Sequence, residues 1–320
     1  MLIPRFVVGI FPIVAMLLGP ATVCGQDFPT KTIRVVTSGV GGDSDIILRI
    51  IMPEISNRLG QPVVLENRPS GVIPAEIVAR ATPDGHTLLT MAAPFWIGSL
   101  LQKTPYDVMR DFSPITSLTT SPAVLVAHPS LAANSVAELI ALAKAKPGAL
   151  NYGSGGTGGT SHLAAELLKS MAGINIVRVN YASGSARMAA SLNGEVHVQF
   201  PSPGLAAPHV KSGKLKALAV TSAQPSALAP GVPTVAASGL PGYEVVGLIG
   251  MFAPARTPAA IINRLNQEVV RHLNQPDMKQ RILDAGEEVA TTTPDAFRSR
   301  LKTDMTRMGK LIKELGIAAK

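Results

Sequence analysis

Cysteine is nearly absent from this 320-residue chain, and the only one is Cys24. It follows an apolar run, Phe6 to Leu18, that begins directly after the basic Arg5. A short apolar run behind a positive charge is the pattern of an export signal, so we expect residues 1–25 to be removed by cleavage near Gly25. The mature chain would then contain no cysteine and could form no intramolecular disulfide, which leaves burial to stabilise it.

Long apolar runs are absent after the signal, so no later stretch is expected to cross a membrane. The mature protein is therefore expected to be exported, to the periplasm. Lipid anchoring through Cys24 stays open as the weaker alternative, since Thr22 and Val23 lead poorly into lipoprotein processing.

Aromatic residues make up only 4% of the chain, and the basic residues behind its net charge of +8 are scattered. Nucleic-acid binding uses clustered basic residues and aromatic side chains on which bases stack, so we expect no nucleic-acid partner. A mild positive charge is compatible with a small anionic ligand and equally with an ordinary soluble surface.

Motifs for cofactors and catalysis are also missing. Gly153–Gly158 formally matches G-x-G-x-x-G, but Ile174–Asn180, the strand expected next, has no acidic residue to hold a ribose. There is no phosphate-loop lysine and no nucleophile elbow, and the histidines lack metal-ligand spacing. We expect no cofactor, no metal, no catalytic residue and no enzymatic activity. An exported α/β hydrolase or transferase using His162 and a loop hydroxyl is the alternative, but we favour a capping role for His162.

What the sequence does contain is an unusual glycine-rich segment, Asn151–His162, directly before a helical pattern. Glycines let a backbone approach a ligand closely, and a helix N-terminus offers unpaired N–H groups and partial positive charge. Such a segment is suited to binding an anion. A single loop of this kind could equally be an ordinary strand–helix turn.

A second segment of the same design lies near the start of the mature chain. Ile33–Thr37 is a predicted strand, Ser38–Asp45 is glycine-rich, and a helix follows with Ser44 or Asp45 as its N-cap and Gly60 as its C-cap. We expect the two loops to face each other across a cleft and to hold one small anion. Alternating strands and helices after each loop predict an α/β fold with mainly parallel sheets.

The motifs together resemble the Bug-type solute-binding proteins, the receptors of tripartite tricarboxylate transporters. The resemblance covers essentially the whole mature chain. It is carried by Pro29–Val36, Gly41–Gly42 with Asp45, Leu59–Pro69, Ala79–Gly85, Pro105–Phe112, Tyr152–Ser154 through Ser161–Leu163, Gly213–Ser222, Val232–Val235, Gly239–Tyr243 and Ala253–Pro254 with Thr257–Pro258.

This resemblance implies a type II-like periplasmic-binding-protein fold of two α/β domains with the ligand cleft between them. Residues 26–122 plus 222–320 would form a discontinuous first domain, and 123–221 the second. It further implies a monomeric receptor that captures a small carboxylate by domain closure and delivers it to membrane permease subunits. A sensor subunit that contacts a signalling partner stays open as an alternative.

The ligand-binding residues implied by this resemblance lie in three loops and at one strand end, and Trp96 is added as the only tryptophan. Pro201 stands where amino-acid-binding members have an Asp that pairs an ammonium group, which favours a simple or aromatic carboxylate. Arg187 could bind a distal carboxylate, although a solvated helix arginine is the plainer interpretation. The complete set is Ser38, Gly39, Val40, Gly41, Gly42, Asp45, Trp96, Ser154, Thr157, Gly158, Gly159, Thr160, His162, Tyr181, Ala182, Ser183, Gly184, Phe200 and Pro201.

Overall fold

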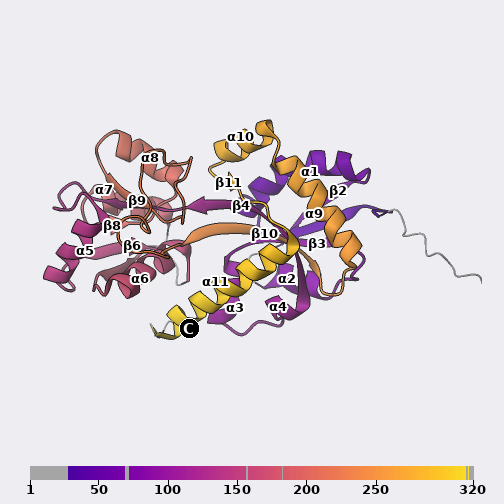
Figure 1. The fold of residues 1–320 in the computed structure, drawn as a ribbon, viewed down its shortest axis with the longest axis horizontal. Coiled ribbons are helices and arrows are strands. Elements are labelled where there is room, and N and C mark those ends of the chain that lie inside the picture. The colour runs from indigo at the N-terminus through magenta and orange to yellow at the C-terminus, as the bar shows by residue number, and fades with distance from the viewer. Residues whose placement is uncertain (1–27, 69–71, 156–157, 182, 315, 317–320) are drawn as a thin grey trace, which may run out of the picture.

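The computed structural model describes residues 28–68, 72–155, 158–181, 183–314 and 316. The predicted signal peptide, residues 1–25, and the predicted site residues Thr157 and Ala182 lie outside this part of the chain. The described residues form two α/β lobes, each built on its own sheet and placed side by side (Figure 1). No helix among them is long and apolar enough to span a bilayer.

The first lobe is built on a six-stranded sheet in the order β11-β4-β10-β3-β1-β2. Its parallel strands β1 and β2 align Thr37 with Asn67, while β10 runs antiparallel to both β3 and β4. The strands are β1 (Ile33–Thr37), β2 (Val63–Asn67), β3 (Thr87–Ala92), β4 (Phe112–Pro122), β10 (Val246–Pro254) and β11 (Glu288–Val289).

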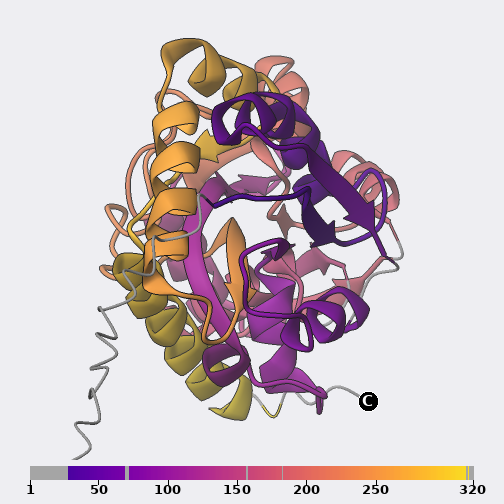
Figure 2. The same cartoon turned by 90° about the vertical axis from the view of Figure 1, so that its right-hand side faces the viewer.

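Helices cover both faces of this sheet (Figure 2). Apolar residues spaced along α1, α9 and α10 fill a core on one face, and α2, α3 and α11 pack on the other. The helices are α1 (Asp43–Leu59), α2 (Ile73–Ala79), α3 (Pro94–Leu101), α4 (Val108–Asp111), α9 (Ala259–Leu273), α10 (Pro276–Asp284) and α11 (Pro294–Glu314).

The second lobe has a five-stranded sheet in the order β7-β6-β8-β5-β9. It comprises β5 (Val124–Ala127), β6 (Asn151–Ser154), β7 (Val177–Asn180), β8 (Val198–Gln199) and β9 (Lys216–Val220), with α5 (Val136–Ala145), α6 (Thr160–Ala172), α7 (Gly184–Leu192) and α8 (Pro203–Lys211). β6 pairs in parallel with β7 and β8, whereas β5 runs antiparallel to β8 and β9.

The α/β fold is confirmed, but both sheets are mixed rather than mainly parallel. The reason is that β10 and β11 in the first lobe, and β5 in the second lobe, run against the direction of the βα units. The helix after the first glycine loop begins two or three residues earlier than predicted, because its N-cap is Gly42 rather than Ser44 or Asp45. Its C-cap is Gly60, and Gly173 closes α6, both in the left-handed conformation that favours glycine.

Two segments connect the lobes, and they are bonded to each other where they cross. The chain leaves β4 at Pro122 and returns from β9 to β10, and the Ala123 N–H donates to the Thr221 hydroxyl over 2.8 Å. The Val245 N–H donates to the Thr221 carbonyl over 2.9 Å. Below this crossing in the view of Figure 1, α11 runs from the first lobe toward α6 of the second, which it contacts.

Candidate functional site

A cleft of about 700 Å³ lies between the lobes. Its second-lobe wall contains the start of α6, the side chain of Arg187 on α7, and residues around the end of β8. Its first-lobe wall contains the beginning of α1, the loop after α10 and the crossing strands. The lining residues are Gly155, Gly159, Thr160, Ser161, Arg187, Phe200, Ser202, Gly204 and Leu205 on one side, and Asp43, Ser121, Pro122, Ala123, Gly247, Ala285, Gly286 and Glu287 on the other.

The first turn of α6 lies in this cleft. Its N-cap, Gly159, supplies no side-chain acceptor, and the first turn carries no acidic residue. The early N–H groups of a helix have no intrahelical acceptors, and the helix dipole adds partial positive charge there. The turn at Thr160 and Ser161 can therefore accept an anion from the cleft.

Arg178, which the sequence interpretation missed, braces the loop before α6. Its Nε donates to the Ser154 hydroxyl over 2.7 Å, and its Nη2 donates to the Gly155 carbonyl over 2.6 Å. These charge-assisted bonds hold the end of β6 in one conformation. Ser154 is thereby occupied with Arg178, and it is fully buried.

His162 braces the same loop from the other side. It is 4% exposed, and its Nδ1 accepts a hydrogen bond from the Gly158 N–H over 3.1 Å. Burial, with the nearby Arg178 cation, lowers the pKa of His162 to about 4, so the ring is neutral at neutral pH. The ring nitrogen that would act as a base is thus already bound to the loop backbone.

Arg187 reaches the cleft with no partner for its charge. Among the described residues, no carboxylate forms an ion pair with it, and its buried Nε has no hydrogen-bond acceptor. Burial lowers the pKa of the guanidinium. A cation removed from water without a counter-charge is costly, so an anion entering the cleft would relieve that cost.

The first glycine loop meets the cleft at its end, through Asp43. Asp45 does not line the cleft, because it is 2% exposed and bonds its own loop: the Gly41 N–H donates to Oδ2 over 2.8 Å, and the Asn67 amide donates to Oδ1 over 2.9 Å. Burial opposes the ionisation of the Asp45 carboxyl. The hydrogen bonds and the Arg49 cation outweigh this effect of burial, so the pKa of Asp45 is lowered. We therefore assign Asp45 to shaping the loop, and Val40 points out at 76% exposure.

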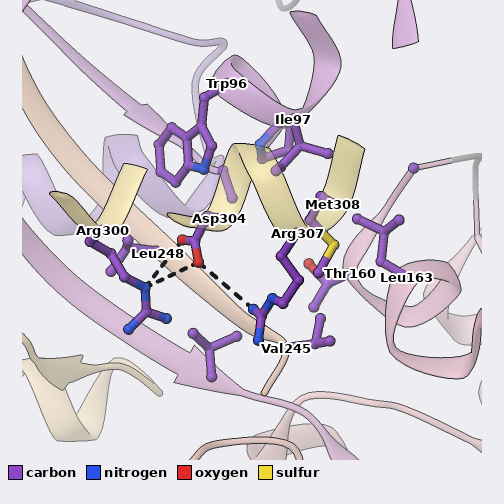
Figure 3. A pocket seen from close by; sticks show the side chains of 14 residues that line it. Trp96, Ile97, Thr160, Leu163, Val245, Leu248, Arg300, Asp304, Arg307 and Met308 are labelled. Carbon is purple, nitrogen blue, oxygen red and sulfur yellow. Dashed lines mark hydrogen bonds and ion pairs between the residues drawn. The ribbon is translucent and has the colours of Figure 1, made fainter. Parts of the chain in front are cut away.

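Trp96 also differs from the prediction, because it lies in a separate pocket behind the cleft (Figure 3). The indole is 1% exposed and packs against Phe252 and Phe297. The charges in this pocket are paired: Arg300 bonds Glu244 at 2.8 Å and Asp304 at 3.2 Å, and Asp304 is 3.7 Å from Arg307. A pocket whose charges are already paired is a poorer anion site than the cleft that holds Arg187.

The remaining predicted positions divide in two. Phe200 lines the cleft, whereas its neighbour Pro201 is buried and bonds the Val124 N–H through its carbonyl. In the third loop, Ser183 caps α7 by accepting from the Ala186 N–H at 3.2 Å, and Tyr181 and Gly184 lie outside the cleft lining. Asp43, Ser202 and Glu287 line the cleft without having been predicted, and the single Gly286 before Glu287 is not a glycine-rich loop.

The two lobes and the cleft between them define the class of protein: a two-domain solute-binding protein with the periplasmic-binding-protein fold. A family model described as "Tripartite tricarboxylate transporter family receptor" matches residues 47–317. The chain belongs to this family, which confirms the resemblance seen in its motifs.

Relatives match it along nearly their whole length. Protein BugT of Bordetella pertussis is 32% identical over 98% of both chains. The structure of R. palustris Rpa4515 with adipate is 31% identical, covers 91% of this chain and 99% of its own, and has a TM-score of 0.72. MatC of Rhodopseudomonas palustris with bound malate is 29% identical, covers 89% and 100%, and has a TM-score of 0.67.

Proposed function

We propose that this chain is a periplasmic receptor that closes its lobes around a small organic carboxylate and delivers it to the membrane subunits of a tripartite tricarboxylate transporter. The moving bodies would be residues 26–122 with 222–320, and residues 123–221, acting as a monomer. The observation that carries the proposal is the unpaired Arg187 guanidinium in the same cleft as the first turn of α6.

The position of the packed contacts supports closure at the cleft. On the back of the molecule, the Tyr243 hydroxyl bonds the Ala164 carbonyl at 2.8 Å, and α11 packs against α6. On the front, Asp43 and Glu287 are separated from Arg187 by the cleft, with no ion pair among the described residues. A rigid-body rotation about the packed side would bring Arg187 and the α6 turn toward the opposite wall.

The relatives solved with adipate and malate support a carboxylate as the ligand class. In a closed cleft with less water, each N–H and guanidinium bond to a carboxylate is stronger than in solvent. An enzymatic role for His162 has less support, because its Nδ1 accepts the Gly158 N–H.

Ligand binding to the mature chain tests the proposal. Mono-, di-, tri- and aromatic carboxylates and amino acids would be screened by thermal shift and by Trp96 fluorescence. A ligand at 100 times its Kd that binds only the folded state stabilises it by about 2.7 kcal/mol. We expect at least one carboxylate to raise the melting temperature and to compact the protein in small-angle scattering.

Arg187→Gln should raise the Kd of that carboxylate at least tenfold, since a charge-assisted hydrogen bond is lost. Arg298→Gln is the matched control, because Arg298 is exposed on α11 and lies outside the cleft lining. A screen in which no carboxylate binds, or in which Arg187→Gln binds like the wild type, would contradict the proposed site.

A further inference from the structure

Both walls of the cleft carry a buried polar atom that has no hydrogen-bond partner in the part of the chain that the structure describes. On the second lobe it is Arg187 Nε, and on the first lobe it is Glu287 Oε2. A buried polar atom without a hydrogen bond is costly, so such atoms call for an explanation. Here the two atoms have opposite chemistry: the guanidinium donates, and the carboxyl can accept.

The Arg187 side is held in place by the glycine loop beneath it. A Cβ at Gly153 would lie 3.0 Å from Arg187 Cγ, and a Cβ at Gly155 would lie 3.0 Å from Nη1. The absence of side chains at these two glycines thus makes room for the arginine to lie along β6 and its loop. Its position is set by packing, which makes it a fixed anchor for one anionic group.

On the first-lobe wall, Glu287 lies with a second carboxyl group, that of Asp43. Glu287 follows α10, and its N–H donates to the Ile282 carbonyl over 3.1 Å; Asp43, the first residue of α1, also lines the cleft. Burial first, and then the nearby Asp43 carboxylate, raise the pKa of Glu287 to about 8. At neutral pH this carboxyl is therefore mostly protonated, and a cation placed beside it and Asp43 would favour its ionised form.

The charges of the two walls distinguish between ligand classes. A dicarboxylate spanning the cleft would place its second carboxylate beside the Asp43 carboxylate, where like charges repel, and would further oppose the ionisation of Glu287. A plain monocarboxylate would satisfy Arg187 and leave the Glu287 oxygen without a donor. A ligand with one carboxylate and one ammonium group pairs with both walls, and burying paired charges costs less than burying single ones.

We propose that Glu287 and Asp43 form a subsite for a protonated nitrogen, so that the cleft selects a carboxylate that also carries an ammonium group. The inference rests on the proposed function, since the carboxylate end uses the Arg187 wall. It also revises the interpretation of Pro201: the carboxyl partner missing after β8 is supplied by the opposite lobe.

Matched ligands test the inference on the mature chain. Hexanoate, 6-aminohexanoate and adipate have the same chain length and differ in the group at the far end; the corresponding four- and five-carbon sets and the α-amino acids vary the spacing. Kd values would be measured by calorimetry at pH 7.5. We expect the amino form of at least one set to bind at least tenfold more tightly than its plain and dicarboxylate counterparts.

Variants then assign the preference to its residues. Glu287→Gln should reduce the preference for the amino form at least fivefold while the plain carboxylate keeps its affinity. Arg187→Gln should weaken the binding of every ligand in the set. Glu268→Gln on α9, outside the cleft lining, is the control and should leave all affinities unchanged.

The outcomes separate the two proposals. If plain carboxylates bind in the cleft but no amino form is preferred, or if Glu287→Gln keeps the preference, the ammonium subsite is wrong and the carboxylate receptor stands. If no carboxylate of any kind binds, both are wrong.

Discussion

The Tyr243 hydroxyl donates a hydrogen bond to the Ala164 carbonyl over 2.8 Å, which ties the segment before β10 to α6 of the other lobe. Tyr243 is fully buried, and burial raises the pKa of its phenol well above its ordinary value. The bond lies on the packed side, opposite the cleft, so it marks the side about which closure would turn.

Tyr243→Phe should therefore destabilise the unliganded protein by about 1 kcal/mol, the net contribution of one hydrogen bond. Urea unfolding measures the change. Tyr106→Phe is the matched control, because Tyr106 is 7% exposed and its hydroxyl forms no hydrogen bond within the described residues. Equal losses in the two variants would show that the hydrogen bond contributes nothing.

Acid should destabilise the protein through His162. Its pKa is about 4 in the folded chain and 6.5 in the unfolded chain, so the unfolded state binds more protons between these values. The contribution of the neutral ring is complete above about pH 6.5 and is lost as the pH falls to about 4. At 1.36 kcal/mol per pKa unit the loss is up to about 3 kcal/mol.

Urea unfolding at a series of pH values would measure this slope. Burial also lowers the pKa of His197 and His272, so these two histidines contribute to the same loss of stability in acid. His162→Gln should therefore reduce the slope of stability against pH without abolishing it. His209→Gln, on the exposed end of α8, should follow the wild type. A His162→Gln curve parallel to the wild type would contradict the assignment of His162 as a buried neutral brace.

Much of the fold could be predicted from the sequence because local signals coincide with it. The strand at 33–37, the Ser135 cap of α5 and the helix ends at Gly60 and Gly173 all follow from side-chain periodicity and capping preferences. The antiparallel entry of β10 could not be predicted this way, because it depends on pairing between residues more than a hundred positions apart.

The residues that line the cleft were predictable from the sequence where a glycine loop and helix start form the wall, and not where distant side chains form it. Gly159 and Thr160 lie in the cleft because a glycine loop followed by a helix exposes N–H groups wherever it occurs. Glu287 gave no signal, since only the tertiary fold brings the loop after α10 opposite α7. Trp96 lies in the aromatic core and outside the cleft lining, and the sequence could not show this because a tryptophan after a strand serves equally well as core.

The loop that carries the α6 N-terminus should be intolerant of a side chain at Gly158. Its φ of +80° is in the left-handed region, and a Cβ there would overlap Leu101 Cδ1 of α3. Gly158→Ala should cost about 2 to 4 kcal/mol, the sum of backbone strain and overpacking. Gly213→Ala, at φ +72° with nothing within 4 Å of its Cβ, should cost only the strain, about 1 kcal/mol.

A double-mutant cycle with Leu101→Ala would identify the overlap. The cost of Gly158→Ala should fall by about 1 to 2 kcal/mol in the Leu101→Ala background, since the clashing methyl group is gone. An unchanged cost would mean that the contact between α3 and the loop does not limit this position.

Glu287 should make the unliganded protein less stable in alkali. Its pKa is about 8 in the folded chain and 4.5 in the unfolded chain, so the folded state binds more protons between these values. Stability therefore falls as the pH rises from about 4.5 to 8. The charged groups that oppose its ionisation are Asp43 on α1 and its neighbour Glu288 in β11, while Thr119 in β4 favours it.

Replacing this carboxyl with an amide removes the cost of ionising it in a poorly solvated position. Glu287→Gln should therefore be about 2 kcal/mol more stable than the wild type at pH 8.5 and nearly equal to it at pH 5, as measured by urea unfolding without ligand. The expected difference is smaller than a full conversion of the pKa shift at 1.36 kcal/mol per pKa unit, because the Glu287 side chain keeps some contact with solvent. Glu268→Gln should show no such divergence. If Glu287→Gln is less stable at pH 8.5, the carboxyl is already paired in the unliganded protein, and no ligand cation is needed to balance it.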